Sequence, residues 1–325
     1  MTQMLRQKQA FAERFVAGAE RRFEDGWPSK EAMGEQGKIR IGISGWRYAG
    51  WRGVFYPRGL AQRRELEFAS HSFDTIEING TFYSLQRPES FTRWAAETPE
   101  NFVFAVKGSR YLTHMLKLRE VRVPLANFFG SGLLLLGEKL GPLLWQFPPQ
   151  MRFDRERFEE FFKILPRSHR EAAALMRRHG SRMGEGAGFR VRRDARLRHC
   201  VEIRHESFVT AEFVELLRAH DIGLVVADTV EWPLLMDVSS DFVYCRLHGS
   251  EQLYTSGYED AALEVWADRV RTWARGDQPE GRRADGKDVE VRPRDVYVYF
   301  DNDAKVRAPV DAKGLRERVD GRVGS

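Results

Sequence analysis

Ionisable side chains lie inside short apolar runs of this sequence. Strand side chains alternate between two faces, so in VEIR the residues Glu202 and Arg204 share one face, and in FVYCRLH Tyr244, Arg246 and His248 share one. Burying a carboxylate or a guanidinium is costly unless it is paired. These runs therefore indicate either a ring of buried salt bridges or a site for acid–base chemistry, and the sequence leaves both open.

The same residue types suit the binding of a small anionic substrate. Lys107, Arg204 and Arg246 could hold a phosphate or carboxylate group while Glu77 or Glu202 acts as general base or acid. The candidate catalytic residues are Glu77, Glu202, His248, His114 and Asp228. The candidate substrate-binding residues are Ser44, Trp46, Asn79, Tyr83, Lys107, Gln146, Arg204, His205, Arg246, Asn302 and Asp303.

A divalent metal is the candidate cofactor, and the sequence assures none. Glu77, Glu202, Asp228, Asp301 and Asp303 could hold such a cation together with histidines. Against this, the lysine and arginines among them would repel a metal. The chain contains no GxSxG elbow, P-loop, GxGxxG, HExxH or CxxC motif, which argues against a serine hydrolase, an NTPase and a dehydrogenase. Hydrolase chemistry of another kind, or isomerase or lyase chemistry, is favoured over oxidoreductase chemistry.

Eight short apolar runs alternate with amphipathic helical patterns along the chain. The predicted strands are Ile39 to Ser44, Thr75 to Ile78, Phe102 to Lys107, Leu143 to Phe147, Cys200 to Ile203, Gly223 to Ala227, Phe242 to Leu247 and Val296 to Phe300. The predicted helices include Leu60 to Ser70, Pro88 to Glu97, Asp154 to Ile164, Ser207 to Arg218 and Glu259 to Arg275. This alternation predicts an α/β fold with a single TIM-type (β/α)8-like barrel, and a doubly wound open sheet is the alternative. In such a barrel the candidate residues collect at the carboxyl ends of the strands.

Charge is distributed unevenly along the 325 residues. Ten arginines and three acids lie within 167–198, a local excess of +7 in a chain whose net charge is +5. Four glycines and little apolar periodicity predict that this segment is a mobile, arginine-rich insertion between strands four and five. Nucleic acid is a candidate partner through it, although most charge runs are only solvated.

The expected domain organisation is one barrel with extensions. Residues 1–37 are predicted to form an N-terminal helical extension, 38–320 the barrel, and 276–295 a charged loop within it. A phenylalanine stripe in the extension would cover a core or a subunit contact, so the oligomeric state stays open. Two cysteines without metal or redox spacing, and no apolar run long enough for a bilayer, predict a cytoplasmic protein with no membrane partner.

Seven segments of this sequence resemble, in order, the signature segments of a known family. They are GISGWRYAGWRGVFYP (42–57), FDTIEINGTFYSL (73–85), FVFAVKGSRYLTH (102–114), LGEKLGPLLWQFPP (136–149), VEIRHESF (201–208), FVYCRLHGS (242–250) and YVYFDNDAKVRAPVDAKGL (297–315). They are similar to the YecE-like proteins, the domain of unknown function 72. The resemblance implies a TIM-type barrel and much less about activity.

The resemblance also implies which residues cluster at the barrel mouth. These are Ser44, Gly45, Trp46, Glu77, Asn79, Tyr83, Lys107, Thr113, His114, Gln146, Glu202, Arg204, His205, Asp228, Arg246, His248, Gly249, Asn302 and Asp303. Two departures stand out. Ile43 stands where the family usually has Thr, and the 167–198 insertion is absent from shorter members.

Three functions therefore compete. The leading hypothesis is an enzyme that acts at the carboxyl ends of the barrel strands on a phosphate- or carboxylate-bearing substrate by acid–base chemistry. The second is a metal-dependent phosphodiesterase or nuclease, which rests on analogy between barrel folds. The third is a ligand-binding or adaptor module without catalytic activity.

Overall fold

Eight parallel strands close into a barrel in the order of the chain. The computed structural model describes residues 36–178, 193–249, 257–302 and 306–321. The strands are β1 (Ile39–Ser44), β2 (Thr75–Ile78), β3 (Val103–Lys107), β4 (Leu140–Gln146), β5 (His199–Glu202), β6 (Ile222–Asp228), β7 (Phe242–Leu247) and β8 (Asp295–Phe300). The predicted barrel is confirmed, and the open sheet is excluded because β1 pairs with both β2 and β8.

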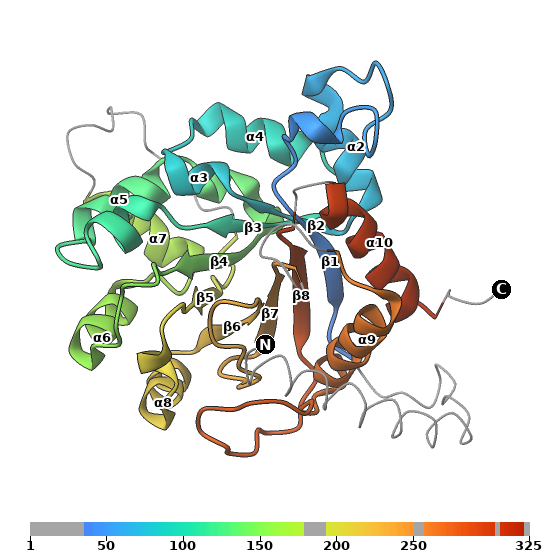
Figure 1. The fold of residues 1–325 in the computed structure, drawn as a ribbon. Coiled ribbons are helices and arrows are strands. Elements are labelled where there is room, and N and C mark those ends of the chain that lie inside the picture. The colour runs from blue at the N-terminus through green and yellow to red at the C-terminus, as the bar shows by residue number, and fades with distance from the viewer. Residues whose placement is uncertain (1–35, 179–192, 250–256, 303–305, 322–325) are drawn as a thin grey trace. The chain divides into compact units, whose positions relative to one another are not determined.

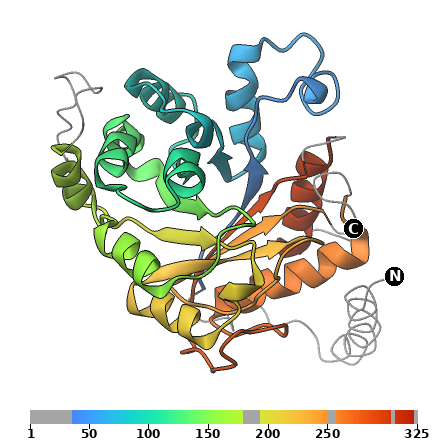
Figure 2. The same cartoon turned by 60° about the vertical axis from the view of Figure 1, so that its left-hand side comes forward.

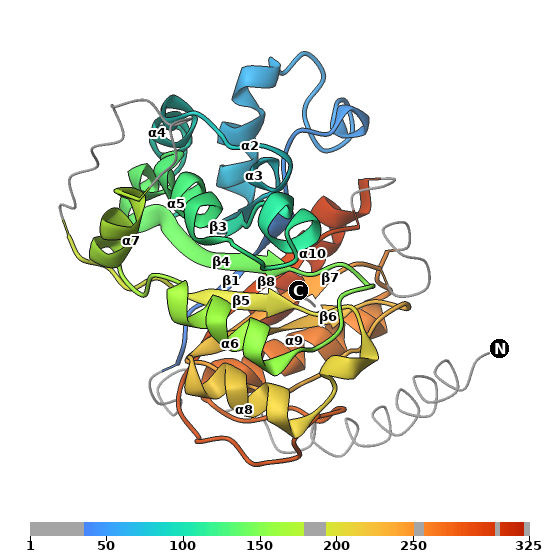
Figure 3. The same cartoon turned by 90° about the vertical axis from the view of Figure 1, so that its left-hand side faces the viewer.

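Helices surround the strands, as Figure 1 shows, and the turned views of Figures 2 and 3 show them outside the sheet on other sides. They are α2 (Glu65–Ser72), α3 (Gly80–Tyr83), α4 (Pro88–Ala96), α5 (Arg122–Gly130), α6 (Arg155–Ile164), α7 (His169–Met176), α8 (Ala211–Ala219), α9 (Asp260–Arg275) and α10 (Arg307–Val319). Short 3₁₀ turns η1 (Ala49–Trp51), η2 (Gln62–Arg64), η4 (Leu133–Lys139) and η5 (Glu206–Phe208) and the π-helical turn η3 (Tyr111–Met115) complete the connections. The helix predicted from Ser207 begins later, because Thr210 caps α8.

Alternation along the strands sorts side chains between two apolar layers. Residues such as Ile43 and Val298 pack outward against the helices. Tyr244, Tyr299 and Cys200 belong to a separate buried cluster that fills the barrel interior. Both cysteines are free and buried, as the sequence predicts. Nearer the carboxyl ends of the strands, the next inward-facing positions carry the polar candidates.

The prediction that 167–198 is a loop is wrong for residues 169–176, whereas residues 193–198 have neither helix nor strand. Residues 169–176 form α7, whose Ala172 and Met176 are buried. Ser168 Oγ accepts a hydrogen bond from the Glu171 amide, which is the N-terminal capping pattern that the arginine content obscured. Residues 179–192 lie outside the described residues, as does the predicted helical extension up to residue 35.

The described arginines at the end of that segment are paired. Arg196 bonds Asp221 and Asp241, and Arg198 bonds Asp241 and Asp295. These acids lie at or just before the amino ends of β6, β7 and β8, which is the barrel face opposite the candidate residues. The charge excess at 193–198 therefore neutralises strand-start carboxylates.

The charged loop at 276–295 has neither helix nor strand over its described length up to β8, as predicted. It is nevertheless tied to the barrel helices, since Lys287 pairs with Glu215 and Arg282 with Glu206. Among the described residues, no helix has both the length and the apolar character needed to cross a bilayer.

Candidate functional site

The guanidinium of Arg246 lies at the centre of the site and is completely buried. Its Nε and Nη2 donate to the two carboxylate oxygens of Glu77 at 3.1 and 2.9 Å. Nη1 donates to Glu202 Oε2 at 2.6 Å, and Nη2 also donates to Asp301 Oδ2 at 2.7 Å. Strands β2, β5, β7 and the end of β8 therefore meet at one cation.

Burial disfavours the charged forms of Arg246, Glu202 and Asp301, but the attraction between their opposite charges outweighs this cost. Burial lowers the pKa of the Arg246 guanidinium, but Asp301, Glu77 and Glu202 hold it well above its usual value. Burial likewise favours neutral Glu202 and Asp301, but Arg246 keeps the pKa of both carboxyls below their usual range. The network is a set of ion pairs at neutral pH.

Glu77 is also bonded from the neighbouring strands. Ser44 Oγ donates to Glu77 Oε1 at 2.9 Å, and the Tyr244 hydroxyl donates to Oε2 at 2.6 Å. With Arg246, the two oxygens of Glu77 accept four hydrogen bonds. All four acceptor sites of this carboxylate are occupied, so Glu77 is poorly suited to act as a general base.

Arg204 and His248, which is completely buried, extend the network around Glu202 and Asp301. Arg204 bonds Glu202 Oε1 at 2.7 Å, and its guanidinium lies 4.0 Å from the centre of the Trp232 ring. His248 Nδ1 lies 3.1 Å from Asp301 Oδ2, and its ring contacts Trp232 edge to face. Both residues are thereby held in fixed positions at the mouth.

Lys107 differs from the other ions of this layer. It ends β3, is 8% exposed, and its Nζ lies 4.5 Å from the centre of the Phe82 ring. No carboxylate of the described residues lies within 4.0 Å of the Lys107 ammonium, and no hydrogen bond of it is found among them. Burial, with Arg246 nearby, lowers the pKa of Lys107 to about 8.

Two amide side chains beside these strand ends also have unused polar atoms. Asn79 Oδ1 is buried without a hydrogen-bond partner among the described residues. Gln146, aligned with Glu202 in the β4–β5 pairing, is 5% exposed and has no side-chain hydrogen bond to a described residue. The interior layer thus has a saturated part around Arg246 and an unsaturated part formed by Lys107, Asn79 and Gln146.

His114 lies against the same phenylalanine as Lys107. Its ring meets Phe82 edge to face at 5.1 Å, and its Nδ1 is 2.9 Å from Thr113 Oγ1. Burial, followed by the charges of Arg204, Lys107 and Arg110, lowers the pKa of His114 to about 4. The imidazole is therefore neutral at pH 7.

Other candidates lie apart from this layer. Asp228 faces outward, where its Oδ2 accepts a hydrogen bond from Trp266 Nε1 of α9, because Ala227 takes the inward position. Asn302 bonds Asp311 of α10, and His205 accepts from the Ser207 amide at the start of η5. Tyr83 is 68% exposed. Asp303 lies outside the described residues.

Trp46 also leaves the barrel interior. Gly45 has φ +79°, a conformation that glycine adopts without strain, and the chain turns there. The Trp46 ring then packs on Trp94 of α4 and on Phe104, whose side chain belongs to the outer layer. The sequence placed this tryptophan in the mouth because it follows a strand end.

Four residues of the site were absent from the catalytic and substrate-binding candidates, although Asp301 was a candidate metal ligand. Asp301 was one of three polar residues after β8, and only its bond to Arg246 singles it out. Tyr244 shares a face with Arg246 in the sequence, so strand alternation could have identified it. Phe82 and Trp232 carry no sequence signal that separates them from other apolar residues.

The ion network predicts how acid affects the protein. Since the folded-state pKa values of Glu202 and Asp301 are depressed, their stabilisation is full above pH about 4.5 and is lost as the pH falls below it. Glu202→Gln should lower the free energy of unfolding by about 3 kcal/mol at pH 7, and the difference from wild type should shrink toward pH 3. Urea unfolding of both proteins at pH 7, 5 and 3 measures this, and a constant difference would contradict it.

The barrel and its site can now be compared with known proteins. The family model described as "Protein of unknown function DUF72" matches residues 40–324. The chain belongs to the DUF72 family. This match confirms the resemblance found in the sequence, and it covers the whole barrel.

Curated relatives of the DUF72 chain match it over a shorter stretch. The UPF0759 protein YunF of Bacillus subtilis (strain 168) is 31% identical over 116 residues, which are 34% of this chain and 40% of YunF. The UPF0759 protein YecE of Escherichia coli (strain K12) is 30% identical over 123 residues, which are 34% of this chain and 43% of YecE. The chain thus spans less than half the length of these relatives.

Two solved DUF72 structures share the fold. The DUF72 family protein from Thermotoga maritima MSB8 has a TM-score of 0.66 at 23% identity and covers 87% of this chain and 99% of its own. A DUF72 family protein from Enterococcus faecalis V583 has a TM-score of 0.60 at 16% identity and covers 88% and 99%. At these identities the likeness extends to the barrel fold alone.

Proposed function

We propose that this DUF72 protein is an enzyme that acts at the carboxyl ends of the barrel strands on a small anionic substrate by acid–base chemistry. The observation that carries the proposal is the Lys107 ammonium, which is buried without a carboxylate partner among the described residues. A buried cation without a counterion is costly, and an anionic group of a substrate would neutralise it.

Lys107 is also the group best suited to exchange a proton near neutral pH. General acid–base catalysis is most efficient when the pKa of the group is close to the working pH, and burial brings that of Lys107 to about 8. Glu77 and Glu202, by contrast, have their oxygens bonded to Arg246, Tyr244 and Arg204. Their role is to fix the position and charge of Arg246.

Neighbouring groups would orient the substrate. Asn79 Oδ1 and the Gln146 amide offer unused hydrogen-bonding atoms at the ends of β2 and β4. Neutral His114 can relay a proton from the other side of Phe82. Arg204, held on Trp232 with 11% of its side chain exposed, adds a second cation at the mouth.

A metal-dependent reaction is less well supported. No three His, Cys, Asp or Glu residues within the described ranges are arranged to hold a metal ion. The carboxylates of the interior already bond Arg246, which would compete with a cation for the same oxygens. We therefore assign no step to a metal, and nucleic acid as a partner gains no support from Arg196 and Arg198, which pair with acids.

The proposal is tested by turnover. Wild type and Lys107→Met are incubated in D2O with dihydroxyacetone phosphate, glyceraldehyde 3-phosphate, pyruvate and oxaloacetate, and conversion or deuterium incorporation is followed by ¹H NMR. We expect conversion or exchange of at least one compound by wild type and none by Lys107→Met, because proton transfer needs the amine. Lys163→Met, which removes a lysine with 60% of its side chain exposed, is the control and should match wild type. A wild-type protein that binds one of these compounds but changes none would favour the non-catalytic binding module.

A further inference from the structure

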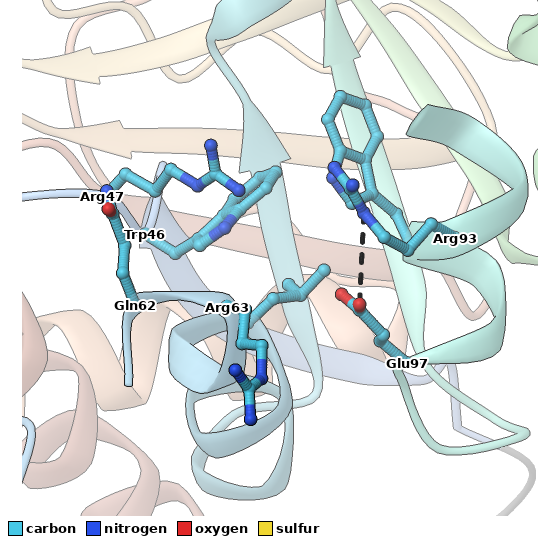
Figure 4. Close-up of a pocket in the computed structure, with 8 residues that line it drawn as sticks. Trp46, Arg47, Gln62, Arg63, Arg93 and Glu97 are labelled. Atoms are coloured by element: carbon cyan, nitrogen blue, oxygen red, sulfur yellow. Dashed lines mark ion pairs between the residues drawn. The ribbon is translucent and has the colours of Figure 1, made fainter. Parts of the chain in front are cut away.

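A second pocket lies on the outside of the barrel, between the chain that follows β1 and helices α2 and α4 (Figure 4). It is lined by Trp46, Arg47, Gln62, Arg63, Leu66, Arg93, Trp94 and Glu97. The pocket has a volume of about 60 Å³, well below the range of about 300 to 1,000 Å³ that is typical of pockets for drug-sized ligands. It has room for a small polar group and its water.

The pocket is rich in hydrogen-bond donors that the protein does not use. The side chains of Arg47, Gln62 and Arg63 have neither an ion pair nor a hydrogen bond with any residue that the structure describes. Figure 4 shows the Trp46 ring with Arg47 on one side and Arg63 on the other. Arg47 follows β1 and Arg63 belongs to η2, so the fold brings these two residues to the same pocket.

The indole N–H groups of Trp46 and Trp94 are further donors in the lining of the pocket. Trp46 and Trp94 are 7% and 6% exposed and pack edge to face, with ring centres 5.4 Å apart. Neither indole N–H donates to a described residue, and both indole nitrogens are accessible to solvent. A tryptophan N–H is a donor only, so these groups can donate to an acceptor that enters the pocket.

Acceptors and negative charge are scarce in the same place. Glu97 is the one acidic residue of the lining, and it is engaged at 3.8 Å by Arg93. The lining therefore contains three arginines and a single carboxylate. Such an excess of cationic and neutral donors suits an oxyanion, whose oxygens accept from several donors at once.

We infer that this outer pocket binds a phosphate-sized oxyanion, either as the free ion or as the terminal group of a phosphate monoester. Arg47 and Arg63 supply the charge, and Trp46 and Trp94 supply N–H donors that are held rigidly by their packing. The site is separate from the mouth, where Lys107 lies, because Trp46 and Phe104 pack in the outer layer.

Calorimetric titration with sodium phosphate at pH 7.5 tests the site, with sodium chloride added to hold the ionic strength constant. We expect saturable binding by wild type and at least tenfold weaker binding by Arg47→Gln/Arg63→Gln, since each lost charged hydrogen bond is worth about tenfold or more. The control Arg119→Gln/Arg152→Gln removes the same charge from two exposed arginines outside the pocket and should bind like wild type. Trp94→Phe keeps the packing but removes one donor, and about threefold weaker binding is expected.

Two further measurements separate the sources of the ligand and the two sites. Titration with glycerol 3-phosphate should give an affinity within threefold of inorganic phosphate if the pocket takes monoesters, and much weaker binding if it takes the free ion. Lys107→Met, which removes the proposed anion contact at the mouth, should retain the phosphate binding that Arg47→Gln/Arg63→Gln removes. The inference fails if wild type shows no saturable binding, if the pocket double variant binds like the control, or if binding is lost in Lys107→Met instead.

Discussion

Replacing Arg246 by methionine is expected to lower the melting temperature by about 6 to 10 °C. The change leaves Glu77, Glu202 and Asp301 in a buried layer without the cation that bonds all three. Removing one partner of a buried ion pair costs about 3 to 5 kcal/mol, and a barrel of this size loses about 2 °C or more for each kcal/mol. Thermal unfolding followed by circular dichroism measures the effect.

A variant that also removes carboxylate charge shows whether unpaired charge is the cause. Arg246→Met/Glu77→Gln/Glu202→Gln removes two of the three carboxylate charges together with the cation, and should recover at least half of the lost melting temperature. Arg204→Met should cost less than Arg246→Met, because Arg246 is fully buried and bonds three carboxylates, whereas 11% of the Arg204 side chain that bonds Glu202 is exposed. A melting temperature of Arg246→Met within 3 °C of wild type would show that the network does not stabilise the barrel.

The barrel could be predicted because each strand carries its own local signal. The runs ending at Ser44, Ile78 and Leu247 end where β1, β2 and β7 end. The helices α5 and α10 were missed, since Pro124 and Pro309 lie inside them and mask the periodicity, although each proline sits within the first helical turn, where it is tolerated. The helix at residues 169–176 was missed because the arginine content of the segment outweighed the capping signal at Ser168 and Glu171.

The candidate site was predictable as a set of positions and not as a set of roles. Strand alternation correctly placed Glu77, Glu202 and Arg246 on interior faces. It could not show which charges pair, because partners such as Arg246 and Glu77 are 169 residues apart and meet only when the barrel closes. The distinction between bonded Glu202 and unpaired Lys107 is therefore a property of the three-dimensional arrangement.

Lys107→Met is expected to abolish turnover and also to stabilise the protein. The pKa of a lysine that is about 10.5 when unfolded falls to about 8 in the folded protein, so the folded state binds the proton less tightly than the unfolded state. Below pH 8 this opposes folding by up to about 3 kcal/mol, and methionine, which fills a similar volume, removes the cost. The melting temperature at pH 7 should therefore rise by about 3 to 6 °C.

The pH dependence distinguishes this cause from better packing alone. Between pH 8 and 10.5, Lys107 has already lost its proton in the folded wild type but still binds one in the unfolded chain. Raising the pH through this range therefore increases the stability of wild type relative to the variant. The advantage of Lys107→Met should thus be largest at pH 7 and nearly vanish by pH 10.5, in urea unfolding at both values. An advantage that is equal at the two pH values would assign the effect to packing. A less stable variant would mean that Lys107 already has a counter-charge in the folded protein, which would remove the main support for an anionic substrate at the mouth.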